Sequence, residues 1–262
     1  MRENDHIANT NFCQAIVRKP ARSLGSGITT AEFGVPDFEK AEWQFAMYVQ
    51  ALEDCGLTVT VLDPLEEFPD AHFVEDTAVV LPDAAILCRP GAASRRGEAE
   101  HMAPVLSRQR ELTRINEPGT LDGGDVLLVG THCLIGLSDR TNKEGATQLG
   151  SLLSDHGYTW QTVPVGAGLH FKSSVNHVGN GTLLVSEEFA GNQALARFDQ
   201  IVVDPAEQYA CNTLLLNDRL LLPSGFPDTR RKLETLGLPI FILSTSEFRK
   251  MDGGLTCLSL RF

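Results

Sequence analysis

The 262-residue chain lacks the features that mark membrane, exported and nucleic-acid-binding proteins. It has no run of about 18 apolar residues, so we expect no membrane-spanning helix. Its polar start, "MRENDHIANTNF", has no apolar core of the signal-peptide type, so we expect a cytoplasmic protein. A net charge of -12 argues against nucleic acid or an anionic membrane as a partner.

The chain also lacks a cysteine framework. Its six cysteines are far apart in a chain too long to need disulfide staples, so we expect reduced thiols. No two histidines or cysteines show the short paired spacing of zinc ligands, and we expect neither a metal nor an organic cofactor. Incidental binding of a soft metal by Cys257 and His170 stays open.

What the chain does have is a repeated pattern: a short apolar strand, a turn and a second apolar strand, then a helix-like stretch. The pattern starts at Val74, Leu121, His170, Tyr209 and Asp252, at separations of 47, 49, 39 and 43 residues. The turns "GTH", "GNG" and "ND" fit hairpin connections. A period of this size indicates a propeller-like ring of repeats rather than an ordinary sandwich.

Helices follow the hairpins. Residues 141–157 open with a capping box, Thr141 to Glu144, and end at Gly157. Residues 227–237 have Asp228 as the expected cap. Pro104 should kink or restart the helix that follows Arg95. The stretch "EEFAGNQALARF" is the weakest helix prediction.

The two ends of the chain complete one repeat. The N-terminal region supplies "CQAIVRKP", a helix that starts after Asp37 and stops at Gly56, and "TVTVLDP", but it lacks an opening strand. "DGGLTCLSLRF" at the C-terminus provides a first strand with no helix after it. We therefore expect a single domain over residues 1–262: an α/β fold in which five β/α units close into a ring and leave no free sheet edge.

The repeat starts share polar chemistry. At their heads stand Glu75 and Asp76, Asp122 and Asp125, His170, Asn212, and Asp252 with Cys257. In a ring these positions converge, and burying them unpaired would be costly, so we expect a central binding site. A lone cysteine is usually a core residue and a lone histidine is usually structural. Together, however, a cysteine, a histidine and an acid form a nucleophile, base and orienter set.

Two arginines occupy equivalent points of consecutive repeats. Arg95 and Arg140 each follow a second strand and precede a helix. They either lie in solvated loops or reach the rim of the central hole, where a guanidinium would bind a carboxylate in bidentate fashion.

Six motifs in order resemble the dimethylarginine dimethylaminohydrolase family: "FPDAHFVEDTAVV", "RPGAASRRGE", "TLDGGDVLLVG", "LSDRTN", "GLHFKS" and "KMDGGLTCLSL". The resemblance runs from "RKPARSLGSGIT" to the C-terminus and implies the five-bladed β/α propeller of guanidino-group-modifying enzymes, in agreement with the repeat count. It implies Cys257 as nucleophile, His170 as general acid and base, and Asp122 as the carboxylate partner of His170. Some relatives carry glutamate where Asp122 stands, and Asp125 is an alternative for this role.

The same resemblance implies a binding set for the substrate. Asp70, Glu75 and Asp76 match substrate-binding acids, and Arg95 and Arg140 match carboxylate-binding arginines. Met251 would contribute its backbone carbonyl. Ile28 matches a residue of a lid, for which Gly25 and Gly27 would provide hinge freedom.

The implied reaction is hydrolysis of asymmetric dimethyl-L-arginine, or of monomethyl-L-arginine, to citrulline and the methylated amine through a covalent thiouronium on Cys257. Arginine deiminase, citrulline hydrolase and amidinotransferase share the fold and are alternatives, although deiminases and amidinotransferases are typically longer. A non-catalytic ribosome anti-association factor of the same fold is an alternative from another class. The only partner we expect is a small-molecule substrate, and the sequence leaves a homodimer open.

Overall fold

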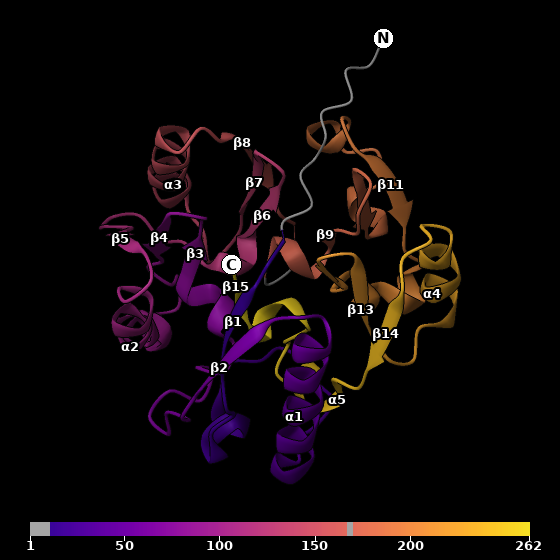
Figure 1. Ribbon diagram of the computed structural model, residues 1–262, viewed down its shortest axis with the longest axis horizontal. Helices are drawn as coiled ribbons and strands as arrows, with labels where there is room; N and C mark the ends of the chain where they lie inside the picture. The colour runs from indigo at the N-terminus through magenta and orange to yellow at the C-terminus, as the bar shows by residue number, and fades with distance from the viewer. Residues whose placement is uncertain (1–10, 167–169) are drawn as a thin grey trace.

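The computed structural model describes residues 11–166 and 170–262, in which five three-stranded sheets are arranged around a common centre (Figure 1). In each sheet the middle strand runs antiparallel to the first strand and parallel to the third. In ring order the sheets are β3 (Ala78–Val80), β4 (Ala84–Leu87) and β5 (Glu111–Arg114); β6 (Val126–Val129), β7 (His132–Leu137) and β8 (Thr159–Pro164); β9 (Val175–His177), β10 (Thr182–Val185) and β11 (Asp199–Val202); β12 (Leu214–Leu216), β13 (Arg219–Pro223) and β14 (Ile240–Leu243); and β15 (Leu260–Arg261), β1 (Gln14–Arg18) and β2 (Thr58–Leu62).

Helices make the crossovers that the parallel strand pairs require. Four blades use an α-helix between their second and third strands: α1 (Phe38–Asp54), α2 (Arg96–Leu106), α3 (Lys143–Asp155) and α4 (Pro227–Glu234). The short α5 (Ser246–Arg249) follows β14. The helix expected within "EEFAGNQALARF" is wrong, because this stretch forms two single 3₁₀ turns, η6 (Glu187–Phe189) and η7 (Gln193–Leu195). Between them Gly191 has a φ of +69°, which a continuous right-handed helix does not allow.

Three local predictions at the helices are corrected by the structure. The cap of α3 is Asn142, whose side chain accepts from Gly145 N–H, while the Thr141 hydroxyl donates to Asp125 instead. Asp228 does not cap α4, because the Glu207 carboxylate accepts from the first backbone N–H groups of that helix. Pro104 does not divide α2, which runs on for two residues beyond it.

The chain ends meet in one blade, as predicted. β15 pairs with β1 in the register Ile16 to Leu260, and β2 completes the sheet. The C-terminal strand is, however, only two residues long, and the sequence before it folds into turns. Cys257 therefore lies in the 3₁₀ turn η9 (Thr256–Leu258) and not in an apolar strand.

Similar 3₁₀ turns precede the first strands of the other blades and carry the polar heads of the repeats. They are η2 (Val74–Thr77), η4 (Gly123–Asp125), η5 (Phe171–Ser173) and η8 (Pro205–Cys211). Five clusters of buried apolar side chains fill the space between sheets and helices. Each cluster combines side chains of two neighbouring blades, so apolar contacts hold the blades to one another. No helix within the described ranges is both long and apolar enough to cross a membrane.

Candidate active site

A cleft of about 30 Å³ brings together eight of the ten residues proposed from the sequence. Those eight are Ile28, Asp70, Asp76, Arg95, Arg140, His170, Met251 and Cys257. Asp122 lies directly behind His170, to which it is hydrogen-bonded. Glu75 does not line the cleft.

The turn that presents Cys257 is shaped by two glycines. A Cβ on Gly253 would lie 2.1 Å from the Phe73 ring, and a Cβ on Gly254 would lie 2.4 Å from the Asn212 side chain. Only glycine permits such close approach. The Gly254 N–H in turn donates to Cys257 Sγ at 3.4 Å. "DGGLTC" thus places a half-buried thiol in the cleft and gives it one backbone donor.

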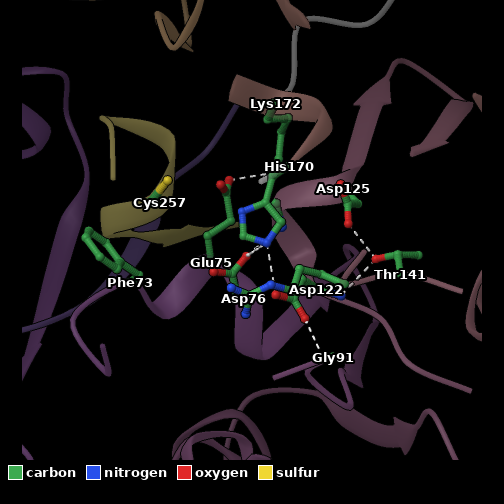
Figure 2. A network of polar contacts seen from close by, with 12 residues as sticks. Phe73, Glu75, Asp76, Gly91, Asp122, Asp125, Thr141, His170, Lys172 and Cys257 are labelled. Atoms are coloured by element: carbon green, nitrogen blue, oxygen red, sulfur yellow. Dashed lines mark hydrogen bonds and ion pairs between the residues drawn. The ribbon is translucent and has the colours of Figure 1, made fainter. Parts of the chain in front are cut away.

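His170 is held from behind by a buried carboxylate. Its Nε2 lies 2.9 Å from Asp122 Oδ2, while Asp122 Oδ1 accepts from Gly91 N–H at 2.8 Å. Nε2 is also 3.8 Å from Asp76 Oδ1. In Figure 2 the other ring nitrogen, Nδ1, is directed toward the side on which Cys257 lies. The arrangement orients the imidazole as a nucleophile, base and acid set requires.

Asp125 makes no hydrogen bond to His170 in the structure, whereas Asp122 does. Asp125 is fully buried and accepts from Phe171 N–H at 2.8 Å and from the Ser138 and Thr141 hydroxyls at 2.6 Å each. Thr141 Oγ1 accepts in turn from the Asp122 N–H. Asp125 therefore fixes the backbone beside His170 and the backbone of Asp122, and Figure 2 shows this part of the network.

The ionisable groups of the cleft have strongly displaced pKa values. Burial, together with the negative charges of Glu75 and Asp76, raises the pKa of Cys257 to about 12. Burial opposes the charged form of His170, but Asp76, the hydrogen bond to Asp122 and the charge of Asp125 outweigh it and raise the pKa of His170 to about 9. At neutral pH the free protein therefore holds a neutral thiol beside an imidazolium.

The two arginines play different parts. Arg95 is buried, and its guanidinium is hydrogen-bonded to the carboxylates of Asp76 and Glu98 and to the backbone carbonyls of Asp70 and Phe73. It therefore supports Asp76, and it lies neither in a solvated loop nor free at the rim, the two alternatives that the sequence left open. Burial favours neutral Asp76, but the charges of His170 and Arg95 lower its pKa to about 2.

Arg140 is the arginine that the cleft presents. It is half-buried, and its guanidinium makes no hydrogen bond or ion pair with residues 11–166 or 170–262. Its backbone N–H donates to Ser138 Oγ, which donates to Asp125. A fixed backbone with an unengaged guanidinium suits the capture of a carboxylate.

A segment that follows the 3₁₀ turn η1 (Arg22–Ser26) contributes Ile28 to the wall of the cleft. The Ile28 N–H donates to both carboxylate oxygens of Asp70 at 3.1 Å, and the Asp252 carboxylate accepts from Thr30 N–H and from the Thr29 and Thr30 hydroxyls. Gly27 has an ordinary φ of -69°, so it uses no glycine-specific conformation. It is required for close approach instead, because a Cβ there would lie 2.3 Å from Asp70 Oδ1.

Glu75 turns away from the cleft although its neighbour Asp76 lines it. Its Oε1 accepts from Lys172 Nζ at 2.7 Å and from Arg261 Nη2 at 3.0 Å. Figure 2 shows Glu75 reaching toward Lys172. Glu75 therefore belongs to the wall behind the cleft, contrary to the direct binding role that the resemblance implied.

Sequence reasoning missed three residues of the cleft, Phe73, Asp252 and Gly253. Phe73 precedes the acidic pair within "HFVED", but an aromatic residue beside a strand reads as core. Asp252 was recognised only as the first residue of a repeat. The sequence does not reveal that Thr29 and Thr30 donate hydrogen bonds to its carboxylate.

Among the described residues, Asp76, Asp122 and His170 form the group that could hold a metal ion, with ligand atoms within 4.8 Å of one another. Their carboxylate oxygens already accept from Arg95, Gly91 and Gly124. Cys257 is not part of this group.

The five-bladed ring with a cysteine, a histidine and carboxylates at its centre defines the class of guanidino-group-modifying β/α propellers. Solved structures of this fold include a cysteine-to-serine variant of dimethylarginine dimethylaminohydrolase from Pseudomonas aeruginosa complexed with citrulline, which has 41% identity, covers 96% of this chain and 99% of that chain, and has a TM-score of 0.94. The N-terminal domain of ArgZ, a cyanobacterial arginine dihydrolase, has a TM-score of 0.85 at 18% identity, with 95% and 97% of the chains covered, and shows the same fold.

The sequence comparisons identify the family. The family model for N,N dimethylarginine dimethylhydrolase, eukaryotic, matches residues 37–204. The N(G),N(G)-dimethylarginine dimethylaminohydrolase of Pseudomonas aeruginosa is 41% identical, with 96% of this chain and 100% of that protein covered. The protein of the same name from Streptomyces coelicolor is 36% identical, with 95% and 96% covered. The chain belongs to the dimethylarginine dimethylaminohydrolase family.

Proposed function

We propose that the protein hydrolyses asymmetric dimethyl-L-arginine to L-citrulline and dimethylamine, and monomethyl-L-arginine to L-citrulline and methylamine. The observation that carries this proposal is a cleft in which Cys257 and the oriented His170 face two carboxylates, Asp70 and Asp76, with Arg140 at its edge. A guanidinium carbon is a poor electrophile, so its attack requires a strong nucleophile and acids that hold the cation. Both relatives named above bear the name of this activity.

The first step forms a covalent intermediate. Entry of the substrate cation favours the Cys257 thiolate, because an opposite charge stabilises the ionised form, and the Gly254 N–H adds a donor. The thiol proton passes to solvent. The thiolate attacks the guanidinium carbon, and protonated His170 gives its proton to the nitrogen of the departing dimethylamine. A thiouronium remains on Cys257. A related structure described as an adduct with S-methyl-L-thiocitrulline supports a covalent route.

The second step uses the same histidine in the other direction. His170, now neutral, takes a proton from water as the water oxygen bonds to the thiouronium carbon. The carbon–sulfur bond then breaks, the proton of the added hydroxyl passes to the sulfur, and citrulline leaves, so that Cys257 is again a neutral thiol and His170 is again an imidazolium. Asp122 keeps the ring oriented and stabilises its charged form throughout.

The cleft must open for this chemistry. Its volume of about 30 Å³ holds about one water molecule, far less than a methylated arginine. The lid bonds at Ile28, Thr29 and Thr30 therefore have to break for substrate entry. When bound, the substrate would meet the Asp70 and Asp76 carboxylates, the Met251 backbone carbonyl, and Arg140 at its α-carboxylate.

Product analysis tests the proposal against enzymes of the same fold. The protein is incubated with arginine, monomethylarginine, asymmetric dimethylarginine and citrulline, and citrulline, ammonia and each amine are measured. We expect citrulline with dimethylamine or methylamine in equal amounts and little ammonia from arginine. Ammonia from arginine as the main product would assign an arginine deiminase, consumption of citrulline would assign a citrulline hydrolase, and no turnover would favour a binding protein.

We also propose that the chain acts as one catalytic domain in the cytoplasm, either alone or as a homodimer. Six free thiols support a reducing compartment. Analytical ultracentrifugation distinguishes the two assemblies.

A further inference from the structure

A second and much larger cavity lies at the centre of the ring, separate from the cleft. Its volume is about 430 Å³, within the range of small-molecule sites, and it shares no lining residue with the cleft. The first strand of every blade contributes to its wall, through Val80, Leu128, His177, Leu215 and Leu260. This cavity, which is larger than the cleft, is thus not the one proposed to catalyse.

One part of the cavity wall is charged. Glu75, Lys172 and Arg261 line it together, and Glu75 Oε1 accepts from both cations. Lys172 and Arg261 carry two positive charges and Glu75 one negative charge, so the cluster has a net charge of +1 in a chain of net charge -12. All three side chains are at most 13% exposed, and an uncompensated buried charge is costly.

The cluster also has donors to spare. Lys172 Nζ carries three N–H groups, of which one serves Glu75, and no other described residue accepts from it. The remaining donors would be satisfied by one more anionic acceptor. Such an acceptor would bring the net charge of the cluster to zero.

The rest of the wall is mainly apolar. Val80, Leu128, Leu215 and Phe262 line it, and Leu128 and Leu215 are only half-buried although they belong to inner strands. A ligand with one anionic head and a hydrocarbon tail would match both parts of this wall. We propose that the central cavity is a binding site for a medium-chain monocarboxylate, with its head at Lys172 and Arg261 and its tail along Leu128 and Leu215.

This site would lie on the reverse side of the active-site wall. Lys172 follows His170 by two residues, and Arg261 Nη1 donates to the carbonyl of Thr256, the neighbour of Cys257. The two sites select opposite charges. A substrate guanidinium is repelled by the positive cluster, while a monocarboxylate completes it, so the ligand is distinct from the proposed substrate.

Calorimetry with octanoate and the wild-type protein tests the proposal, and the Arg140→Ala variant described below distinguishes the central cavity from the cleft. We expect saturable binding of one octanoate per chain. Butyrate, which lacks most of the tail, and 1-octanol, which lacks the charge, should each bind at least about tenfold more weakly. Absence of saturable octanoate binding overturns the proposal. Equal affinity for 1-octanol and octanoate overturns the carboxylate assignment, because the cavity would then be an apolar void only.

Variants locate the binding. Leu128→Phe fills the cavity and should weaken octanoate at least tenfold, whereas Ile242→Phe on the exposed side of β14 is the matched control and should change nothing. Lys172→Met should weaken octanoate by a similar factor, and Lys172→Arg should retain most of the affinity. If Leu128→Phe binds octanoate as tightly as the wild type does, or if Arg140→Ala abolishes binding, the ligand lies elsewhere and the proposal is wrong.

Discussion

At the scale of single residues, the cleft stores positive charge on His170 before any substrate arrives. The carboxylates of Asp76, Asp122 and Asp125 raise the pKa of His170 to about 9 against the effect of burial, while the Cys257 thiol stays neutral. Without substrate, the general acid His170 is thus protonated, and the nucleophile Cys257 is still a neutral thiol. Activation then depends on the substrate cation, which limits attack by the thiol on other compounds.

The raised pKa of His170 has a consequence for stability. A group whose folded-state pKa lies above its ordinary value of 6.5 stabilises the fold fully below pH 6.5, and this stabilisation is lost as pH rises through about 9. The loss amounts to about 3 kcal/mol. Urea unfolding of the wild type and of His170→Asn at pH 6 and pH 9.5 should show this extra loss in the wild type alone. The same pH dependence in both proteins would contradict the raised pKa.

Arg140 should read the substrate's carboxylate. Dimethylagmatine lacks that group, so Arg140→Ala should lower kcat/KM for asymmetric dimethylarginine by roughly a hundredfold while changing dimethylagmatine turnover little. Measuring both substrates with both proteins forms a cycle that isolates the pair. Equal losses for the two substrates would mean that Arg140 supports the fold or the lid instead.

At the scale of elements, Asp125 joins three segments that carry site residues. It bonds from η4 to Phe171 beside His170, to Ser138 beside Arg140, and to Thr141, which holds the Asp122 backbone. The positions of His170, Arg140 and Asp122 therefore depend on one another through Asp125.

Asp125→Asn should disturb the alignment of these elements. An amide cannot accept from all three donors, so we expect kcat to fall at least about tenfold with KM changed less, and stability to fall by about 1–3 kcal/mol. Because Asp125 helps to raise the pKa of His170, that pKa should also move back toward 6.5, which imidazole NMR titration would measure. Ser138→Ala, which removes one of the three bonds, should have a smaller effect. An unchanged titration and unchanged kcat would assign Asp125 to the fold alone.

The sequence predicted the elements where a repeated pattern was strong. Apolar spacing and glycine stops predicted the hairpins and the blade that the two chain ends share. They also predicted three of the four helices expected between Val74 and Asp252. Prediction failed where side chains choose between local and distant partners. The Thr141 hydroxyl leaves its helix for Asp125, and a carboxylate from η8 caps α4.

The candidate site shows the same division. Cys257, His170 and Asp122 meet because the ring brings equivalent positions together. The opposite directions of the Glu75 and Asp76 side chains could not be predicted. Two neighbouring acidic residues in a 3₁₀ turn show no sequence pattern that indicates which of them points into the cleft. Nor does the sequence say that Arg95 is enclosed by Asp76 and Glu98 while Arg140 is not.

At the scale of the whole molecule, a two-residue strand at the C-terminal end, β15, completes the blade formed by the N-terminal region. Leu260 pairs with Ile16 of β1, and Arg261 pairs with Glu75 and holds the Thr256 carbonyl. Leu260 and Arg261 therefore both complete the N-terminal blade and support the turn that carries Cys257.

Ending the chain after Ser259 should destabilise the whole ring rather than fray one strand. It exposes the apolar partner surface of Leu260 and leaves Glu75 with Lys172 as its remaining cation. We expect a loss of about 5 kcal/mol, or roughly 10–20 °C in Tm, by calorimetry. Phe262→Ala, which keeps both residues of β15, is the control and should cost less than about 2 kcal/mol. A truncated chain that melts like the wild type would show that β15 does not hold the ring together.

We propose that this protein hydrolyses methylated arginine with Cys257 as the nucleophile. The most direct test of this proposal is the rate of dimethylamine release from asymmetric dimethylarginine by the wild type and by Cys257→Ser. Serine keeps the volume of the side chain but is not ionised near neutral pH, so the account predicts steady release by the wild type and none above background by the variant. Retention of more than a few per cent of the wild-type rate in Cys257→Ser, or no release by the wild type, would contradict it.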